Sequence, residues 1–227
     1  MEIKTVQNLL NILSKSGGLQ MFRGQTRDWS LLPSIGRYPS VVKSYGDWRN
    51  FHEQIIYQFL RLGHPYLSGQ HLKSTENWIL GQHHNLPTRL LDTTTNPLKA
   101  LFFSVNNPSN DKYDGIFYIV TYDVWREELD KEHRNYWDDE LVPFLPAQLD
   151  SRLMAQEGAF ISYPLPKNSK PLTPMDKLKD EHVKFTKLTI PATAKPRLRR
   201  ELEVLGIQFR FLFPDLDGVA RGISLSL

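Results

Sequence analysis

Residues 82–105, with the sequence QHHNLPTRLLDTTTNPLKALFFSV, are the segment that most constrains how this chain can fold and where it can act. Two histidines, an arginine, an aspartate and three threonines precede a helix signature, in which Asn96 suits the cap and Pro97 the first turn. A polar loop that is fixed by proline and leads into an apolar helix can hold side chains and free backbone N–H groups over a cleft. The segment therefore predicts the place of a site, although it does not specify a reaction.

Composition describes a globular protein of 227 residues, with 40% hydrophobic and 11% aromatic side chains. The absence of cysteine excludes disulfides, thiolate zinc sites and cysteine nucleophiles, and it fits a reducing compartment. The first residues read as an amphipathic helix and not as a signal peptide, and no run approaches the roughly 18 apolar residues of a membrane span. We expect a soluble, cytoplasmic protein without membrane partners. Its net charge of +3 permits nucleic-acid contact without requiring it.

Hydrophobic periodicity predicts helices and short strands that alternate without regular βαβ spacing. The expected helices begin at Thr5, Asp47, Ser74 or Thr75, Pro97, Pro196 and Asp215, with a short one near 124–129. The expected strands are 19–24, 115–122, 157–163 and 183–190. A loop at 164–180, rich in lysine and proline, is expected to be the most mobile region. The pattern predicts one α+β domain over 1–227, with short antiparallel sheets flanked by helices.

Familiar catalytic motifs are absent from the sequence: there is no Gly-rich phosphate loop, no H-E-x-x-H helix and no G-x-S-x-G elbow. Of seven histidines only His83 and His84 are adjacent, and neighbours do not share a helix face as zinc ligands usually must. We therefore expect no metal site.

Arg23 and Gly24 form the first informative motif, at the end of the strand 19–24. The arginine offers five donors in a fixed fork, and the missing side chain of Gly24 would let a phosphate or carboxylate ligand approach the backbone. The alternative is a salt bridge from Arg23 to a structural aspartate, with Gly24 simply making a turn.

The central block offers a second pair of interpretations. Arg89 and Asp92 lie three residues apart and can pair with each other, or Asp92 can orient Arg89 or His83 while the hydroxyls of Thr93 and Thr94 face a ligand. A run of threonines before Asn-Pro is also what a plain helix cap looks like.

Two further clusters carry polar groups. Gln156 and Glu157, at the start of the strand 157–163, can hold a ribose hydroxyl or stabilise a developing cation, or they can be a polar helix end stopped by Gly158. On the C-terminal basic helix, four cationic residues form either a solvated face or a phosphate contact: Lys195, Arg197, Arg199 and Arg200.

Four motifs together resemble the FRG-domain family, which takes its name from a phenylalanine-arginine-glycine motif. They are FRGQ (22–25), HHNLPTRLLDTTTNPLKALFF (83–103), RLMAQEGAFI (152–161) and LFPDLDGVA (212–220). The second block is the most specific, and the similarity spans nearly the whole chain. The resemblance implies a bacterial or phage protein, often in settings suggestive of toxins or defence, with an antitoxin protein as a candidate partner.

A weaker resemblance concerns the arginine–serine–glutamate layout of ADP-ribosyltransferases. Carried over residue by residue, Arg23 corresponds to the arginine that binds NAD phosphate or ribose, Thr93 and Thr94 to the hydroxyls that line the nicotinamide-ribose pocket, and Glu157 to the glutamate that holds the ribose. Gln156 is the alternative to Glu157. The resemblance implies an ADP-ribosyltransferase-like fold and NAD as substrate.

These features lead to a first hypothesis of a toxin or defence effector that moves ADP-ribose from NAD to a macromolecule, with DNA or RNA favoured over protein as acceptor. Arg23 and Gly24 would bind phosphate, and Gln156 and Glu157 would lie at the scissile ribose. Four residues would shape the pocket: His83, Arg89, Asp92 and Thr93. A second hypothesis is a sensor that binds a nucleotide or nucleic acid without turnover, and a third is a nuclease acting through His83 and Asp92.

Overall fold

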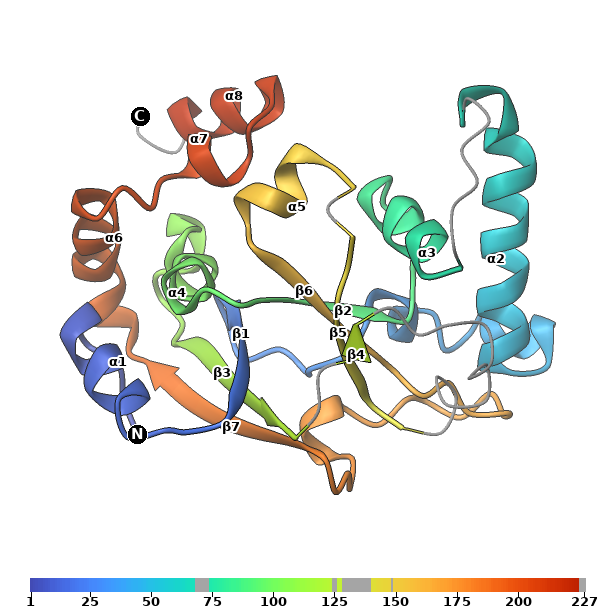
Figure 1. Cartoon of the computed structure of the whole chain (residues 1–227), viewed down its shortest axis with the longest axis horizontal. Helices are drawn as coiled ribbons and strands as arrows, with labels where there is room; N and C mark the ends of the chain where they lie inside the picture. The colour runs from blue at the N-terminus through green and yellow to red at the C-terminus, as the bar shows by residue number, and fades with distance from the viewer. Residues whose placement is uncertain (68–73, 124–125, 128–139, 148, 225–227) are drawn as a thin grey trace.

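The computed structural model describes residues 1–67, 74–123, 126–127, 140–147 and 149–224, which build one sheet covered by helices (Figure 1). The sheet has seven strands in the order β4-β5-β6-β2-β1-β3-β7. Their bounds are β1 (Leu19–Gln25), β2 (Leu90–Thr94), β3 (Gly115–Tyr122), β4 (Arg126–Glu127), β5 (Val142–Leu145), β6 (Gly158–Ser162) and β7 (Val183–Ile190). Every neighbouring pair is antiparallel except the short β4, which lies parallel to β5. The α+β prediction is confirmed, although one continuous sheet takes the place of several short ones.

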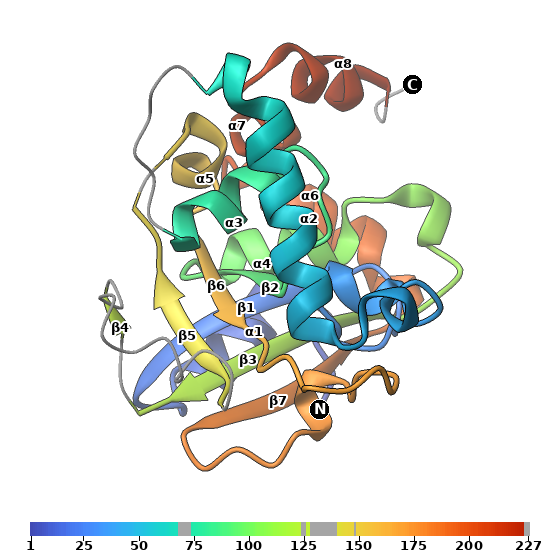
Figure 2. The same cartoon turned by 90° about the vertical axis from the view of Figure 1, so that its right-hand side faces the viewer.

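The helices are α1 (Val6–Leu13), α2 (Trp48–Gly63), α3 (Ser74–His83), α4 (Pro97–Val105), α5 (Ser151–Ala155), α6 (Lys195–Val204), α7 (Phe209–Leu212) and α8 (Leu216–Ser224). In Figure 1, α1 and α6 lie at one end of the molecule and the long α2 stands at the other. Turning the molecule brings α2 to the front, with α3 and α5 close behind it (Figure 2).

Local side-chain caps explain where the main helices begin. Thr5 accepts a hydrogen bond from the N–H of Asn8, Asp47 does the same for α2, and Asn96 accepts from the first turn of α4. Such side chains satisfy N–H groups that have no partner inside the helix. These three predicted starts are confirmed because the capping residue and the freed donor are close neighbours in sequence.

Several segments differ from their predicted structure. The threonine run was expected in a loop, but Thr93 and Thr94 belong to β2, and β5 is not among the expected strands. Of the short helix expected near 124–129, residues 126–127 are instead the strand β4 and the others lie outside the described residues.

The lysine- and proline-rich loop at 164–180 is anchored and not free. Its Met175 N–H donates to the carbonyl of Leu31, and its Lys170 carbonyl accepts a 2.7 Å bond from the Trp48 indole. Leu165 and Met175 are fully buried. Because hydrophobic burial and hydrogen bonds tie it to the core, the loop forms part of the packed structure.

The two larger of the three apolar clusters in the described residues lie on the two faces of the sheet, and β1 contributes to both. Met21 belongs to the cluster beneath α2, whereas Phe22 belongs to the cluster formed with α1, α4 and α6. This alternation follows from the period of two in a strand. Because the alternation continues along β1, Arg23 lies on the same face of the sheet as Met21. Gly24 lies on the other face with Phe22, and α4 covers that face.

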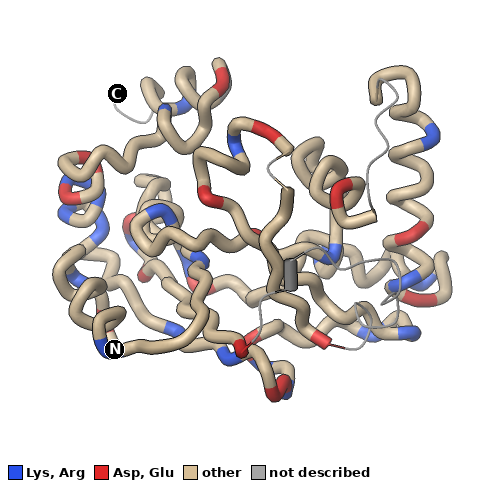
Figure 3. The backbone as a smooth tube through the Cα atoms, in the orientation of Figure 1, with Lys and Arg blue, Asp and Glu red and all other residues tan. Residues whose placement is uncertain are grey.

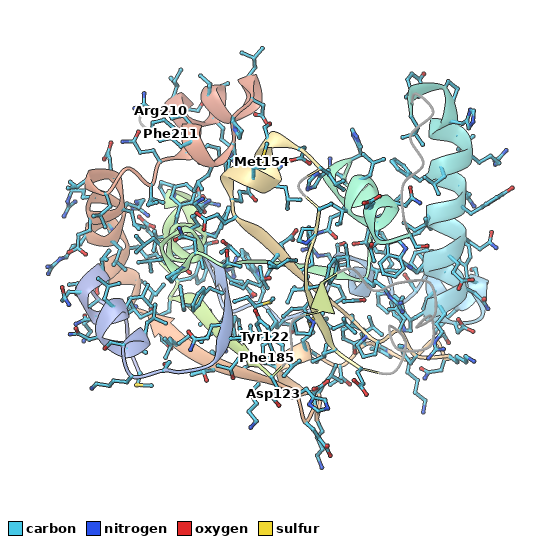
Figure 4. All side chains as sticks on the ribbon, in the orientation of Figure 1. Tyr122, Asp123, Met154, Phe185, Arg210 and Phe211 are labelled. Atoms are coloured by element: carbon cyan, nitrogen blue, oxygen red, sulfur yellow. The ribbon has the colours of Figure 1, made fainter. Side chains whose placement is uncertain are left out.

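The far end of β3 and β7 closes the α2-side cluster. Tyr122 and Phe185 lie together there with Asp123 just beyond them, opposite the end that carries Met154 and Phe211 (Figure 4). Asp123 forms an ion pair with His182 at 3.6 Å. Burial raises the pKa of the Tyr122 hydroxyl well above its ordinary value, so the ring stays neutral.

Strands β1 and β2 are paired at only one position, Phe22 opposite Thr94, whereas β1 is paired with β3 along its whole length. The two strands therefore diverge beyond that pair. Helix α4, which follows β2, packs directly over Gly24, where an added Cβ would lie 1.9 Å from the carbonyl oxygen of Ala100. This close approach, and not access for a ligand, is the reason for glycine at position 24.

We predict that Gly24→Ala is strongly destabilising, because the new methyl group would meet a helix backbone that cannot move independently. The expected loss is about 3 kcal/mol, which thermal denaturation should register as a large fall in Tm. Gly17→Ala is the matched control, since nothing lies within 4 Å of its Cβ position. Equal melting temperatures for the two variants would contradict the packing argument.

His52 is a buried histidine on α2, only 3% exposed, and its ring lies 5.2 Å from that of Trp78. Burial, and secondarily the nearby charge of Arg89, hold its pKa well below 6.5. The folded protein therefore keeps this imidazole neutral, whereas in the unfolded chain it binds a proton once the pH falls below the ordinary histidine pKa of about 6.5.

Stability should consequently fall as the pH drops below the ordinary histidine pKa of about 6.5, by up to roughly 1.4 kcal/mol per pH unit until the folded-state pKa is reached. Urea denaturation at several pH values should show a weaker dependence in His52→Phe than in the wild type. His182→Gln, which changes an exposed histidine, should keep the wild-type dependence. An unchanged pH dependence in His52→Phe would exclude His52 as its source.

Candidate functional site

A pocket of about 950 Å³ opens where β1 and β2 diverge. Residues 22–26 line one side, residues 92–94 line the other, and residues from α3, α5 and α8 complete the wall. Its volume is at the upper end of the range for small-molecule sites, large enough for a dinucleotide. The segment in which the sequence predicts a site therefore lines a cavity.

Cationic side chains dominate the wall of this pocket. Four arginines line it: Arg23, Arg37, Arg152 and Arg221. Among the described lining residues, Asp92 supplies the one carboxylate. Guanidinium groups bind phosphate and carboxylate oxygens through paired N–H donors, so the wall is suited to an anion.

Arg23 bridges the gap between the diverging strands. Its Nη1 donates a hydrogen bond to the main-chain carbonyl of Asp92 and lies 3.8 Å from that residue's carboxylate. Burial lowers the pKa of Arg23, while the charge of Asp92 opposes the shift. Within the described part of the chain the Nε has no hydrogen-bond partner, but it is buried, so a ligand in the pocket would reach this donor only if the side chain moved.

The carboxylate of Asp92 contacts two side chains, those of Arg23 and Gln82. Its Oδ1 accepts a 2.6 Å hydrogen bond from Gln82 of α3, and the carbonyl of the Gln82 amide accepts one from the Thr88 hydroxyl. Two thirds of the Asp92 side chain stays exposed, at 66%. Asp92 therefore does not pair with Arg89, which was one of the two predicted alternatives. Instead, a series of hydrogen bonds from Thr88 through Gln82 to Asp92 orients the carboxylate beside Arg23.

Thr93 and Thr94 both line the pocket, but their hydroxyls are already bonded within the protein. Thr93 contacts the Met21 sulfur at 3.1 Å, whereas Thr94 donates to the Gln156 carbonyl at 2.7 Å and accepts from the Asn96 N–H at 3.0 Å. Thr94 therefore fastens β2 to the start of β6 and to the cap of α4. Gln156 also lines the pocket, and its amide donates to the Leu212 carbonyl at 3.0 Å.

Glu157 is not among the residues that line the pocket. Its carboxylate pairs with Lys99 at 2.7 Å and accepts from Asn96 at 3.1 Å, and the hydrogen bond from Lys99 is the main reason its pKa lies below the ordinary value. Its backbone has φ 46°, the left-handed region that favours glycine after a helix end. The structure thus places the predicted catalytic carboxylate beside the first turn of α4.

Arg89 also lies outside the pocket, in the interior beneath α3. It is 4% exposed, and its guanidinium lies 5.3 Å from the centre of the Trp78 ring. This placement favours a structural role over the predicted one in ligand binding, because the side chain packs α3 against the end of β2.

His83, by contrast, lines the pocket, where its Nδ1 pairs with the carboxylate of Asp150, the cap residue of α5. This contact connects α3 to α5. Of the predicted site residues, seven therefore meet at the pocket: Arg23, Gly24, His83, Asp92, Thr93, Thr94 and Gln156.

The basic cluster on α6 is mostly occupied by contacts within the protein, and acidic positions follow the basic ones toward the end of this helix (Figure 3). Lys195 is fully buried and donates to the carbonyls of Thr26 and Asn110 at 2.7 and 2.9 Å. Arg197 pairs with Glu201 of its own helix, and Arg199 pairs with Asp111. The cluster therefore stabilises the fold, and the structure does not support the phosphate contact proposed for it.

Several pocket residues were not singled out from the sequence, among them Arg37, Arg221 and Gln82. Arg37 lies in a short 3-10 helix (Ser34–Arg37), and Arg221 lies in α8, so neither has a local motif that marks it. Gln82 opens the segment 82–105, but its role becomes visible only through the contact with Asp92.

The described residues contain no helix long and apolar enough to cross a membrane and no group of three or more His, Asp or Glu placed to hold a metal ion.

Comparison with known proteins gives one match. Residues 19–113 match the family model described as FRG domain, while no curated protein and no solved structure matches the chain. The matched range includes Arg23 and β2 and ends before β3, so it supports the FRG family over the part of the chain that forms most of the pocket. Gln156 and Glu157 lie outside it.

We predict that Thr94→Val is destabilising by about 1–3 kcal/mol, because it would leave the Asn96 N–H and the Gln156 carbonyl without their shared partner. Thr93→Val should change stability by less than about 1 kcal/mol, since sulfur is a weak acceptor. Urea denaturation of both variants measures the difference. Equal losses would contradict the fastening role of Thr94.

Proposed function

We propose that this chain binds NAD in the pocket between β1 and β2 and transfers its ADP-ribose to a macromolecule, as a toxin or defence effector. The observation that carries the proposal is the set of four arginines on a pocket of about 950 Å³. A pyrophosphate-containing dinucleotide matches both the charge and the size of that pocket. The FRG-domain match over residues 19–113 is in keeping with the effector role that the sequence resemblance implies.

Arg23 is the group best placed to hold phosphate. It lies at the centre of the sheet, it lines the pocket, and its position is set by the bond to the Asp92 carbonyl. A guanidinium that is already positioned and partly desolvated binds an anion with little further loss of side-chain entropy. Arg37 and Arg152 are exposed on the wall and would complete the contact.

The arrangement of three neighbouring strands supports the transfer step. Thr94 lies opposite Phe22 on β1 and opposite Gly158 on β6, so Arg23, the threonines and the Gln156–Glu157 pair are close together in space. These are the three segments that the sequence resemblance to ADP-ribosyltransferases requires to meet.

In the proposed reaction the bond between the ribose C1′ and the nicotinamide nitrogen breaks, and nicotinamide leaves with the electron pair. An acceptor nucleophile forms the new bond to C1′ and releases its proton to water. Positive charge develops on the sugar between these events, so a nearby carboxylate stabilises the transition state more than the ground state. Glu157 would supply this group if its side chain left Lys99 for the pocket.

A second candidate function, binding of a nucleotide without turnover, is favoured by the present position of that carboxylate. Glu157 is engaged by Lys99 and Asn96, and Asp92 is engaged by Gln82 and Arg23. A pocket with occupied carboxylates can still bind an anion through its arginines. The same experiment distinguishes the two functions.

We expect NAD to bind the wild type, as measured by calorimetry, and Arg23→Lys to weaken binding at least about tenfold because the forked donors are lost. Arg37→Ala should weaken it less, roughly threefold, since the side chain is exposed. Arg197→Ala is the matched control, because Arg197 lies on α6 and pairs with Glu201. No measurable affinity for NAD in the wild type would overturn the proposal.

Nicotinamide release in the presence of DNA, RNA or lysate acceptors then separates transfer from binding alone. Glu157→Gln should reduce release on the order of a hundredfold while leaving NAD affinity within a few-fold. Binding of NAD by the wild type without any release would establish the second function. Undiminished release in Glu157→Gln would remove Glu157 from the mechanism.

A further inference from the structure

We infer that the loop after β1 is a stacking platform for a base of single-stranded nucleic acid, presented at the mouth of the pocket by Trp29. The inference rests on the proposed function, since it identifies the acceptor class of the same site. Trp29 is 49% exposed and is one of the residues that line the pocket.

The loop that carries Trp29 is held rigidly at several points. The Trp29 carbonyl accepts a 3.0 Å hydrogen bond from Gln25, and its N–H donates to the Arg27 carbonyl at 2.9 Å. Asp28 pairs with Lys187 of β7 at 2.6 Å, and the buried Lys195 holds the Thr26 carbonyl at 2.7 Å. A large aromatic side chain is thus kept partly in solvent on a loop that cannot readily fold it inward, an arrangement that favours binding of a flat partner.

Cations and aromatic rings alternate beside Trp29. The Arg27 guanidinium lies 3.8 Å from the centre of the Tyr113 ring and 5.6 Å from that of Trp29, and Lys112 Nζ lies 5.2 Å from Tyr113. The rings come together because Gln25 at the end of β1 is opposite Ile116 at the start of β3. Aromatic faces combined with arginine are the features by which proteins stack the bases of single strands and contact their phosphates.

Charge near the platform also favours a polyanion. Arg27 and Lys112 lie at the Tyr113 ring beside Trp29, and Arg37 lines the same pocket as Trp29. The acidic residues of the adjoining segments are engaged within the protein: Asp28 with Lys187, Asp111 with Arg199, and Asp114 with the N–H of Ala192. Carboxylates occupied in this way oppose an incoming phosphate less than free ones would.

A single strand is the form of nucleic acid that fits. The bases of a duplex are stacked on one another and are not available to a protruding tryptophan, whereas an unpaired base can be placed on it. Because Trp29 shares the pocket with Arg23, a base stacked on it lies beside the proposed NAD site. The acceptor atom of a single strand would then be within the same cavity.

The test measures fluorescence anisotropy of labelled single-stranded DNA and RNA of about 10 nucleotides, in low salt and without NAD. The wild type should bind, and Trp29→Ala should weaken binding about tenfold or more, with partial recovery in Trp29→Phe. Tyr57→Ala is the matched control, since Tyr57 is an exposed aromatic residue on α2, at 61%. Duplexes of the same sequence should bind more weakly than single strands.

Calorimetry with NAD on the same variants separates this inference from the proposed function. A loss of oligonucleotide affinity in Trp29→Ala that is much larger than its loss of NAD affinity supports the platform. Oligonucleotide binding that is absent in the wild type, or equal in Trp29→Ala and Tyr57→Ala, overturns it even if NAD binds. Loss of NAD affinity alone would also overturn it, because the base on Trp29 would then belong to the bound nucleotide.

Discussion

The structure depends on how β1 and β2 are held together at the centre of the sheet. The ladder between them has one register pair, Phe22 opposite Thr94, and Arg23 extends the connection by donating to the Asp92 carbonyl. Helix α4 supports the same junction from one face by packing on Gly24. A side chain that takes over a main-chain connection is exposed to the cavity it spans. The stability of the sheet and the recognition of an anion therefore involve the same guanidinium.

Local patterns in the sequence were sufficient for most elements but not for the sheet's central junction. Asp47 and Asn96 cap the donors three or fewer residues away, so sequence spacing determines the helix starts. The strand β2 was missed because its residues other than Asp92 are buried on both faces and do not alternate, and because Asn96 and Pro97 signal a loop so soon after it. β5 contains Pro143, which is unusual inside a strand but tolerated beside the two-residue edge strand β4.

The same distinction holds for the candidate site, where residues in short local motifs could be predicted from the sequence and residues brought together by the fold could not. Arg23, Asp92 and the threonines stood out because they are concentrated in short polar motifs. Arg37 and Arg221 come from segments far apart in the sequence, and only the folded chain brings them to one wall. Glu157 lies directly before β6, where the sequence places it, but its ion pair with Lys99 determines the direction of its side chain. Strand neighbours could thus be anticipated, whereas side-chain orientation could not.

The divergence of β1 and β2 gives this sheet two inner edges. Residues 23–25 and 91–93 have no ladder partner across the gap, although both strands are paired normally on their outer sides. Main-chain N–H and C=O groups are obligatory hydrogen-bonding groups, so a ligand that enters the gap can bind to the backbone itself. Such contacts survive almost any side-chain substitution.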